Sequence, residues 1–336
     1  MSVNFAVLGA GRIGQVHARA IAEVPAAKLV AVADPMEDAA MVVSKAYGCD
    51  VRSIDQIAAS GDVDAVVICT PTDMHADLIE QFAHAGKAIF CEKPIDLDVA
   101  RVKACLNTVN ELGATLMLGF QRRFDPDFQA LRAAIDAGEI GDVELVTLTS
   151  RDPSPPPYAY IERSGGIFRD MTIHDFDVAR WMLGEEVESV IAAASVLVDP
   201  KIGELGDFDS ANVIMTTASG KQCTINNSRR ATYGYDQRIE VHGSLGSLSA
   251  GNHHQSRVTQ ANAQGYSQPP LQDFFMTRYQ AAYAAEITAF VEALAGGQAP
   301  APSGNDGLLA LALAEAALQS VKTGTAVKVA DVVEGT

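Results

Sequence analysis

The sequence predicts an α/β protein with two parts: an N-terminal doubly wound parallel sheet, and a C-terminal α+β domain with a mostly antiparallel, open-faced sheet. Up to residue 120, short apolar runs alternate with segments of helical spacing, whereas beyond it strand-like runs follow one another. The length of 336 residues and the hydrophobic share of 48% suffice for two domains with cores of their own. We expect domains at residues 1–120 and 121–336, with the C-terminal helices able to pack back on the first domain.

The first part has the pattern of strands that are joined by single helices. Val3 begins an apolar run that Gly9 closes, and a segment of helical spacing follows before Pro25. Because a right-handed helical crossover returns the chain to the same edge, consecutive strands of this kind run parallel. The predicted strands are residues 3–8, 29–33, 65–69, 88–91 and 115–119, and the predicted helices are residues 13–24, 36–47, 74–85 and 98–112.

The pattern changes after Phe120, where strand-like runs are separated by turns rich in Gly, Asp and Ser, as is typical of an antiparallel sheet. The proline-rich stretch 153–157 cannot join a strand ladder, and two Ala-rich segments near the C-terminus favour helices. The predicted strands are residues 143–149, 187–198, 211–217, 222–227 and 238–242, the predicted helices are 128–137, 271–295 and 307–321, and the predicted surface loops are 47–53, 251–270 and 296–304.

Composition and charge exclude several classes of function. The formal net charge of −17 argues against nucleic acid or an anionic lipid surface as a partner, because both require a basic face. The sequence has no run of eighteen apolar residues, so we expect no membrane span. The five cysteines include no Cys-x-x-Cys pair, so we expect neither a disulfide framework nor a metal site, and we expect a cytoplasmic location.

A glycine-rich turn follows the first predicted strand and begins the first predicted helix. Gly9 permits a tight turn, Gly11 lets the backbone approach a pyrophosphate, and Gly14 lets helix and strand pack closely. A glycine-rich turn without a ligand is the alternative. The motif supplies five candidates for cofactor binding: Gly9, Gly11, Arg12, Ile13 and Gly14.

Asp34 ends the second predicted strand, about 20 residues after the last glycine, where a carboxylate accepts hydrogen bonds from both ribose hydroxyls of a dinucleotide. The same carboxylate would repel a 2′-phosphate. Since Pro35 and Met36 follow, without a neighbouring Arg or Lys, the sequence favours NAD over NADP as the cofactor. The alternative is that Asp34 only caps the next helix.

Two further motifs follow strands at the carboxyl edge of the first sheet, where ligands bind in open α/β folds. Thr70, Pro71 and His75 are expected beside the cofactor, although a plain loop-to-helix cap and a structural role for His75 remain open. Glu92 and Lys93 follow the next strand and are also expected beside the cofactor. A lysine there can donate to a substrate oxygen and support a developing alkoxide, the alternative being a surface lysine.

Asp170 and His174 are four residues apart in a segment, 165–177, that leads into a helix. On a helix this spacing places both side chains on one face, so that they can point into one pocket. Histidine is the natural proton acceptor near neutral pH. A zinc site would need a third ligand that the neighbouring sequence does not offer, and an ordinary helix pair is the remaining alternative.

The order of these motifs resembles the glucose–fructose oxidoreductase / inositol dehydrogenase (Gfo/Idh/MocA) family over nearly the whole chain. Within the family, the stretches 120–128, 150–153 and 233–243 are most similar to bacterial members that oxidise inositol at the 2-position. The stretches that carry the resemblance are GAGRIG, Asp34, CTPTDMH, CEKP, GFQRRFDPDF and GGIFRDMTIHDFDVARWMLG.

The resemblance implies an N-terminal Rossmann domain that binds NAD, and a C-terminal domain that binds substrate and mediates dimers or tetramers. It implies Lys93, Asp170 and His174 as a catalytic triad. The implied reaction is the NAD-dependent oxidation of a cyclic polyol, myo-inositol to 2-keto-myo-inositol. A polyol needs several polar partners, and the candidates besides the triad are Arg122, Asp152, Tyr233 and Tyr235.

Two other functions remain open at this point. A related dehydrogenase that acts on glucose, another aldose or a sugar acid would keep the same triad, because the loops choose the substrate. A non-catalytic protein that binds the dinucleotide to regulate a partner belongs to a different class. The intact triad argues against that class, because a sensor needs no proton acceptor beside the nicotinamide.

Overall fold

The computed structural model describes residues 2–335, which form two compact units. Unit 1 holds the residues up to Asp125 together with Gln280–Leu311, and unit 2 holds Pro126–Tyr279 together with the residues from Ala312 onward. The domain limits that we expect from the sequence are 1–120 and 121–336. They remain a prediction.

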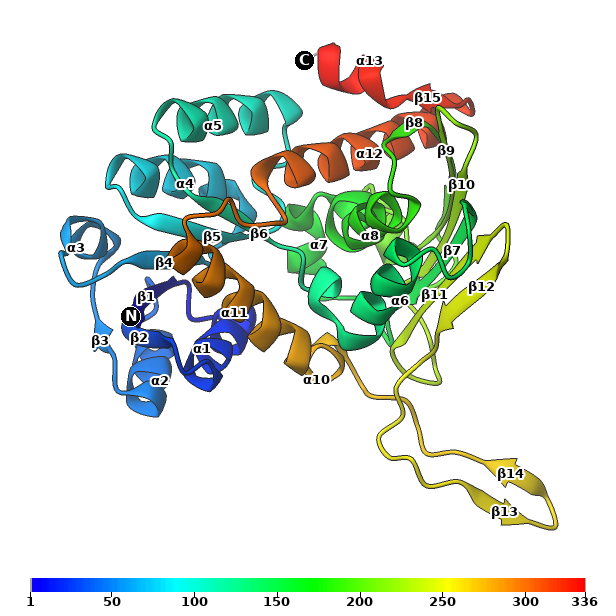
Figure 1. Ribbon diagram of the computed structural model, residues 1–336, viewed down its shortest axis with the longest axis horizontal. Helices are drawn as coiled ribbons and strands as arrows, with labels where there is room; N and C mark the ends of the chain where they lie inside the picture. The colour runs from blue at the N-terminus through cyan, green and yellow to red at the C-terminus, as the bar shows by residue number, and fades with distance from the viewer. Residues whose placement is uncertain (1, 336) are drawn as a thin grey trace. The chain divides into compact units, whose positions relative to one another are not determined.

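Unit 1 is built on a six-stranded parallel sheet in the order β3-β2-β1-β4-β5-β6. The strand order reverses between β1 and β4, which is the point where doubly wound sheets bind their ligands. Figure 1 shows α1 and α2 on one side of this sheet and α4 and α5 on the other. The predicted doubly wound sheet is therefore confirmed. Its elements are β1 (Val3–Leu8), α1 (Arg12–Glu23), β2 (Ala27–Ala33), α2 (Glu37–Tyr47), β3 (Asp50–Val51), α3 (Ile54–Ala59), β4 (Ala65–Ile68), η1 (Thr72–Met74), α4 (His75–His84), β5 (Ala88–Glu92), α5 (Val99–Glu111), β6 (Leu116–Gly119), η2 (Gln121–Phe124) and α11 (Gln280–Gly296).

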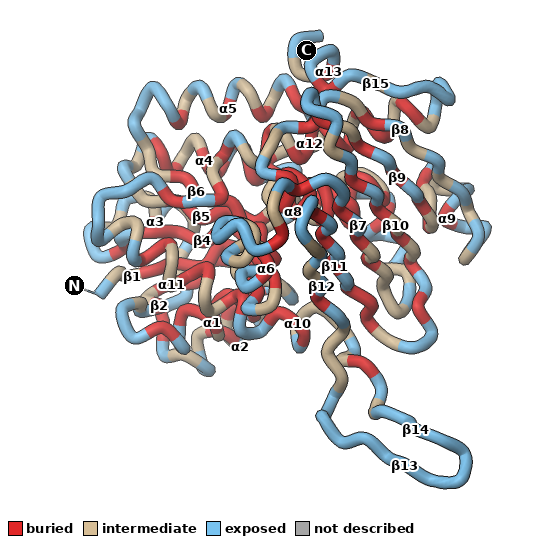
Figure 2. The backbone as a smooth tube through the Cα atoms, turned by 45° about the vertical axis from the view of Figure 1, so that its right-hand side comes forward, coloured by how far each residue is buried: buried red, intermediate tan, exposed pale blue. Residues whose placement is uncertain are grey.

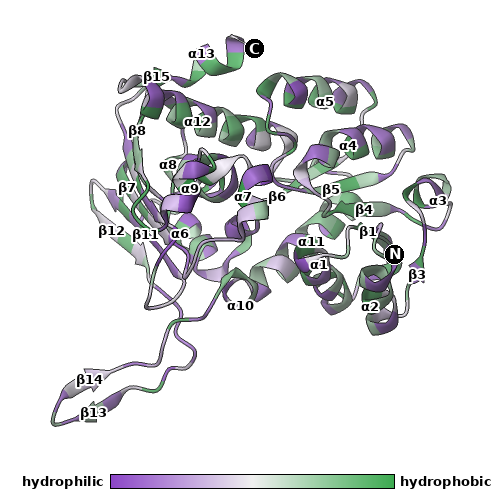
Figure 3. Cartoon of the chain, turned by 180° about the vertical axis from the view of Figure 1, so that it is seen from behind, coloured by the Kyte–Doolittle hydropathy of each residue, from purple (hydrophilic) through white to green (hydrophobic). Residues whose placement is uncertain are grey.

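The core of unit 1 is formed by strands that are apolar on both faces, as parallel sheets covered by helices require. All four residues of β4 are buried, and Figure 3 shows the hydrophobic character of β4 and β5. Helix α11 completes this core from late in the chain. Its Phe290 ring packs against Phe5 at 6.2 Å and against Phe90 at 5.9 Å between ring centroids.

The expectation of a plain loop at residues 47–53 was wrong, because β3 lies within it and α3 follows. Strand β3 is a two-residue edge strand whose side chains are exposed, so it has no apolar run that could reveal it. Helix α3 begins with a capping box between Ser53 and Gln56, a local signal that does identify a helix start.

Unit 2 is built on a seven-stranded sheet in the order β12-β11-β7-β10-β9-β8-β15, in which β7 and β10 pair in parallel and the other neighbours are antiparallel. This arrangement confirms the predicted mostly antiparallel sheet. The elements are α6 (Pro126–Asp136), β7 (Val143–Arg151), α7 (Tyr158–Ser164), the π-helical turn η3 (Phe168–Thr172), α8 (Ile173–Leu183), β8 (Val187–Ser195), α9 (Pro200–Glu204), β9 (Ser210–Thr217), β10 (Gln222–Ser228), β11 (Asp236–Gly243), β12 (Gly246–Ala250), β13 (Gln260–Asn262), β14 (Gly265–Ser267), α10 (Phe275–Arg278), α12 (Gly304–Thr323, which begins in unit 1), β15 (Val327–Lys328) and α13 (Val329–Glu334).

The two faces of this sheet differ. Helix α8 lies against β7 and β10 and covers side chains such as Val146 and Leu148. The alternating residues on the other face are exposed, among them Leu145, Ile191 and Ile214. The period-two pattern of burial is the sign of a sheet with one covered and one open face.

Two predictions for the region after β12 were wrong in part. Residues 251–270 are not only a loop, because β13 and β14 form an exposed hairpin there (Figures 1 and 2). The helix predicted from residue 271 begins only at Phe275, because Leu271 pairs with His254 in an isolated β-bridge. Among residues 2–335, no helix has the length and apolar composition needed to cross a membrane.

Candidate functional site

Of the three glycines in the turn after β1, only Gly11 borders open space. A Cβ atom at Gly9, where φ is +94°, would lie 2.6 Å from the carbonyl oxygen of Cys69, and one at Gly14 would lie 1.8 Å from the carbonyl oxygen of Gly9. Only glycine therefore allows α1 to approach the turn so closely. A Cβ atom at Gly11 would meet no described atom within 4 Å, so the backbone there borders open space.

The N-terminus of α1 follows this open position. Its N-cap is Gly11, which has no side chain to bond the first N–H groups, and the first turn, Arg12 included, contributes no acidic residue. Free N–H groups and the positive end of the helix dipole attract an anion such as a pyrophosphate. Arg12 is exposed and Ile13 is half-buried at this end of the helix.

Asp34 stands at the end of β2, beside the glycine turn. Its Oδ2 atom accepts a hydrogen bond from the Ala10 N–H at 2.7 Å, and its Oδ1 atom accepts one from the Met36 N–H at 2.7 Å. The N-cap of α2 is Met36, so Asp34 is not the cap residue that was the alternative interpretation. A carboxylate has about four acceptor sites, so capacity remains for ribose hydroxyls. The glycine turn and Asp34 thus fit a dinucleotide.

His75 connects the loops that follow β4 and β5. Its Nδ1 atom lies 2.8 Å from the carbonyl oxygen of Pro94, and its Nε2 atom lies 2.8 Å from that of Thr70. Burial lowers the pKa of His75, although the two carbonyl contacts oppose this effect. The ring thus contacts one carbonyl oxygen of each loop and links the two loops. Thr70 is half-buried, and Pro71 is exposed on the same loop.

Glu92, just before Lys93, belongs to a buried cluster with His17 of α1 and Glu286 of α11. Its Oε1 atom lies 2.6 Å from Nε2 of His17, and Nδ1 of His17 lies 4.0 Å from Oε1 of Glu286. Burial in the first place, and the charge of Glu92 in the second, raise the pKa of Glu286 well above its ordinary value. The Glu92 side chain thus anchors the end of β5 inside unit 1.

The same three side chains offer potential metal ligand atoms that all lie within 4.8 Å of one another. Metal ions hold nitrogen and oxygen ligands at about 2.1 Å, which keeps such ligands roughly 3 Å apart from each other. The contact of 2.6 Å between His17 and Glu92 is shorter than that and has the geometry of a direct hydrogen bond.

Asp170 lies in the π-helical turn Phe168–Thr172, which continues directly into α8. His174 is in the first turn of α8. The predicted helix start is present, but the regular α-helical spacing assumed for this pair was wrong for the turn that holds Asp170. A π turn closes i→i+5 hydrogen bonds and occurs frequently at functional sites.

The Asp170 carboxylate is contacted from two other elements of unit 2. The hydroxyl of Tyr160 on α7 donates to its Oδ1 atom at 2.8 Å. The guanidinium of Arg229, just after β10, has its Nη2 atom 3.9 Å from Oδ2 of Asp170. Helix α8 is itself fixed to β10, because Asn227 donates to the buried Asp175 at 2.8 Å.

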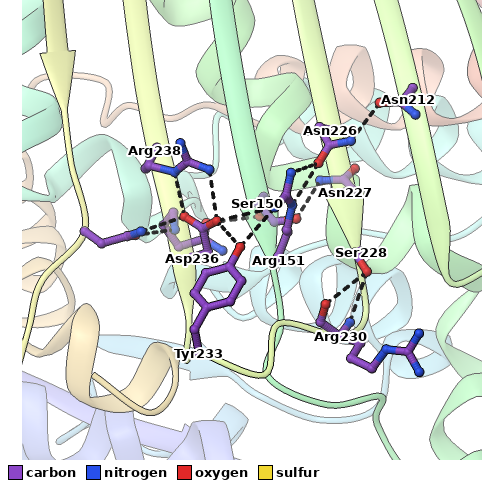
Figure 4. Close-up of polar contacts among 12 residues, drawn as sticks. Ser150, Arg151, Asn212, Asn226, Asn227, Ser228, Arg230, Tyr233, Asp236 and Arg238 are labelled. Atoms are coloured by element: carbon purple, nitrogen blue, oxygen red, sulfur yellow. Dashed lines mark hydrogen bonds and ion pairs between the residues drawn. The ribbon is translucent and has the colours of Figure 1, made fainter. Parts of the chain in front are cut away.

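Tyr233, one of the four further candidates for polyol binding, belongs to a polar network on the sheet of unit 2 (Figure 4). Its hydroxyl donates to Asp236 at 2.6 Å and accepts a bond from Arg151 at 3.0 Å. Arg151 also bonds Asn226 at 2.8 Å through its Nε atom, and Arg238 bonds Asp236 at 2.8 Å. The exposed fraction of Tyr233 is 50%, so the ring remains accessible.

The other three candidates have different surroundings. Tyr235 is buried, with its ring edge-on to Phe274 at 5.5 Å between centroids. Asp152 is half-buried directly after β7 in unit 2, whereas Arg122 is buried in unit 1. The predicted residues are therefore divided between the units: Lys93 and Arg122 belong to unit 1, and Asp152, Asp170, His174, Tyr233 and Tyr235 to unit 2.

Sequence reasoning missed four residues that support these groups. His17 left a signal, because it is a histidine on the buried apolar face of α1. Glu286 left a weaker one, as an acidic residue between the buried Tyr283 and Ile287 of an Ala-rich helix. Tyr160 and Arg229 left none, because both lie on other elements than Asp170 and only the tertiary fold brings their side chains to it. The four residues are His17, Tyr160, Arg229 and Glu286.

Two family models match the chain. Residues 3–120 match a model described as an oxidoreductase family with an NAD-binding Rossmann fold, and residues 128–249 match the GFO/IDH/MocA C-terminal domain. The expected family resemblance is confirmed by these matches.

The chain is similar to proteins of known name over nearly its full length. It is 64% identical over 321 residues to an inositol 2-dehydrogenase of Rhizobium meliloti, covering 96% of this chain and 97% of the relative. It is 42% identical to a myo-inositol 2-dehydrogenase of Thermotoga maritima, covering 98% of this chain and 100% of the relative. The solved structure of a scyllo-inositol dehydrogenase from Lactobacillus casei with bound NAD(H) and scyllo-inositol is 29% identical, with a TM-score of 0.91 over 98% of this chain and 100% of that one.

Proposed function

Because the chain belongs to the GFO/IDH/MocA oxidoreductase family, we propose that it oxidises myo-inositol to 2-keto-myo-inositol with NAD as the hydride acceptor. The observation that carries this proposal is the 64% identity to an inositol 2-dehydrogenase over 96% of the chain. The chain is an NAD-binding oxidoreductase, and the substrate is the part that needs a test.

In the proposed mechanism, the substrate hydroxyl lies between Lys93 and His174. His174 takes the hydroxyl proton as general base, while the ammonium of Lys93 supports the developing alkoxide. Asp170 orients the imidazole and stabilises its protonated form. The π turn and the bond from Tyr160 support this role, since they fix the Asp170 carboxylate at the start of α8.

NAD, when bound, supplies the acceptor for the hydride that leaves the carbinol carbon. Gly9, Gly11 and Gly14 would hold its pyrophosphate at the N-terminus of α1, and Asp34 would hold the adenine ribose. The loops that His75 joins would lie beside the nicotinamide and keep Lys93 at the carboxyl edge of the sheet. We propose Arg122, Asp152, Tyr233 and Tyr235 as further partners of the polyol.

A substrate panel tests the proposal. Formation of reduced nicotinamide is followed by absorbance with myo-inositol, scyllo-inositol, glucose and a sugar acid, each with NAD and with NADP. We expect turnover with the inositols and NAD. Turnover confined to glucose or the sugar acid would move the chain to the sugar dehydrogenases of the family. Tight NAD binding without turnover on the panel would favour a dinucleotide-binding regulator.

The general base is tested by His174→Ala. We expect turnover to fall by about 10²- to 10⁴-fold, with NAD affinity largely kept, because general-base assistance contributes about this factor. His84→Ala, at an exposed position at the end of α4, is the matched control and should leave turnover unchanged. Turnover of the His174 variant at the level of the intact protein would remove the residue from this role.

We further propose that the protein forms a homo-oligomer, a dimer or tetramer, through the open face of the unit 2 sheet. The exposed apolar side chains of that face, Leu145, Ile191 and Ile214, support this proposal. The five cysteines, all within the described residues, are unpaired and buried, in keeping with the cytoplasmic location that we expect.

A further inference from the structure

We propose that Arg229 is a positioning residue of the reaction: its buried guanidinium, held by Asp207, fixes the Asp170 carboxylate and its negative charge at the start of α8. The inference rests on the proposed function, in which Asp170 and His174 act as a pair. Arg229 itself touches neither substrate nor cofactor in this proposal.

The burial of Arg229 requires a reason. Its exposed fraction is 1%, and an arginine keeps its charge at every accessible pH. A buried charge without a counter-charge is strongly unfavourable, so such residues are paired. Its Nη2 atom lies 3.1 Å from Oδ2 of Asp207 and 3.9 Å from Oδ2 of Asp170. The guanidinium therefore serves two carboxylates at once.

The interaction is electrostatic rather than a set of directed hydrogen bonds. Neither Nη1 nor Nη2 of Arg229 meets hydrogen-bond geometry with a described residue, although Asp207 is close enough in distance. The attraction across 3.9 Å joins a buried guanidinium to a half-buried carboxylate, where screening by water and salt is weaker than at the surface. The charge of Arg229 is thus the property that matters for Asp170.

Asp207 connects this charge to the backbone of the π turn. Its Oδ1 atom accepts a hydrogen bond from the N–H of Ile167 at 2.8 Å, directly before Phe168. Gly166, with φ of +83°, makes room, because a Cβ atom there would lie 2.6 Å from Oδ1 of Asp207. Asp207 therefore holds both the start of the turn and the guanidinium that faces Asp170.

Two other polar groups near the π turn act differently from Arg229: Tyr160 bonds the other oxygen of Asp170, and Arg169 has a partner of its own. Tyr160 donates to Oδ1 of Asp170, whereas the contact of Arg229 is with Oδ2. Arg169, on the same turn, pairs with Glu315 of α12. Among the described residues, the titratable and charged groups around this site include Tyr160, Arg169 with its partner Glu315, Asp207 and Arg229, with His174 as the proposed partner of Asp170.

A nearby cation favours the deprotonated form of a coupled Asp–His pair, so it lowers the pKa at which the pair takes up a proton. Asp207 acts in the opposite direction, because a nearby anion favours the protonated form. Burial raises the pKa of Asp207 itself, and the charge of Asp170 adds to that rise, so the two carboxylates sense each other. Removal of the Arg229 charge and removal of the Asp207 charge should therefore shift the pKa of the Asp–His pair in opposite directions.

The first experiment is Arg229→Met, measured as the pH profile of kcat. We expect kcat at neutral pH to fall about 10- to 100-fold, and the acidic limb of the profile to move to higher pH, since removal of a nearby cation makes the Asp–His pair easier to protonate. Arg229→Lys keeps the charge, so it should retain most of the kcat of the intact protein and leave the acidic limb close to its original position. Arg230→Met removes the exposed neighbouring arginine and should change neither.

The second experiment is Asp207→Asn, which keeps an oxygen that can accept from Ile167 but removes the negative charge. We expect its acidic limb to move to lower pH, opposite to that of Arg229→Met. A merely structural role would lower activity in both variants without opposite shifts. An unshifted limb in the Asp207 variant, or shifts of the same sign, would overturn the inference even if the Arg229 variant folds poorly.

A readout besides activity separates this inference from the proposed function. In ¹⁵N-histidine NMR, the His174 ring, assigned by comparison with His174→Ala, should titrate at higher pH in Arg229→Met than in the intact protein. If the intact protein oxidises none of the panel, the proposed function fails, while the NMR shift still tests the electrostatic link. If the intact protein is active and the His174 titration is the same in both proteins, the inference fails alone.

Discussion

Glu286 of α11 is a carboxyl group that the fold removes from water entirely. Its exposed fraction is 0%, and neither of its oxygens has a hydrogen-bond partner among the described residues. Burial and the neighbouring Glu92 raise its pKa, so the folded protein holds this proton more tightly than the unfolded chain does. Glu286 therefore makes its own contribution to how the stability of the protein depends on pH.

We predict that Glu286→Gln removes this dependence. As pH rises above the ordinary glutamate value of 4.5, the unfolded chain releases the proton while the folded protein retains it, so the free energy of unfolding of the intact protein falls. The free energy of unfolding of Glu286→Gln, relative to that of the intact protein, should therefore rise from pH 5 to 8, by at most about 1.4 kcal/mol per pH unit. Urea denaturation at several pH values measures it.

The control for this prediction is Glu292→Gln, an exposed glutamate on the same helix, which should follow the intact protein. If the free energy of unfolding changed with pH in the same way for the intact protein and the Glu286 variant, Glu286 would be ionised in the folded state, and the prediction would fail.

Among the helices, α12 has its first turn fixed by one aspartate. Asp306 accepts hydrogen bonds from the N–H and hydroxyl of Ser303 at 2.7 and 2.8 Å and from Arg123 at 2.9 Å. Burial alone would raise the pKa of Asp306, but the charge of Arg123 and these bonds outweigh it and lower the pKa to about 2. An ionised carboxylate at a helix start also suits the helix dipole.

We predict that Asp306→Asn lowers the free energy of unfolding by about 2 kcal/mol at neutral pH, because the lowered pKa reports that much stabilisation of the charged form. This stabilisation is complete above the ordinary pKa of 3.8 and is lost as pH falls through about 2. The difference between variant and intact protein should therefore shrink to about half at pH 3. Thermal or urea unfolding at pH 7 and pH 3 measures it.

Asp331→Asn is the matched control, since Asp331 is an exposed aspartate in the first turn of α13. A destabilisation of the Asp306 variant that does not change with pH would assign its effect to packing rather than to charge.

At the scale of the whole molecule, the open face of the unit 2 sheet is the surface through which we propose assembly. It presents Leu145, Ile191 and Ile214, whereas the opposite face is covered by α8. Apolar side chains spread over an uncovered sheet suit contact with an equivalent sheet of a second copy.

We predict that the double variant Leu145→Lys/Ile214→Lys lowers the molar mass measured by light scattering after size exclusion, because buried, unpaired lysines would oppose the contact. Leu112→Lys, an equally exposed leucine in unit 1, should leave the mass unchanged. A monomeric intact protein, or a mass that the double variant does not alter, would contradict the proposed interface.

Features with a local physical cause were predictable from the sequence alone. The parallel sheet of unit 1 follows from apolar runs that alternate with single helices, and the glycine turn follows from backbone positions where a Cβ atom cannot fit. Asp34 follows in the same way from its place at the end of a strand. Strand β3 and the hairpin β13–β14 were missed, because exposed strands carry no apolar pattern.

The sequence thus determined which segments form the nucleotide-binding sheet and which chemical groups stand at its edge. Only the tertiary structure decided how these groups are held: the bond of His17 to Glu92, and the placement of Arg229 between Asp207 and Asp170. The physical reason is that strand periodicity and glycine geometry act between near neighbours in the chain. Buried charges find their partners across distant segments, where no spacing in the sequence records the contact.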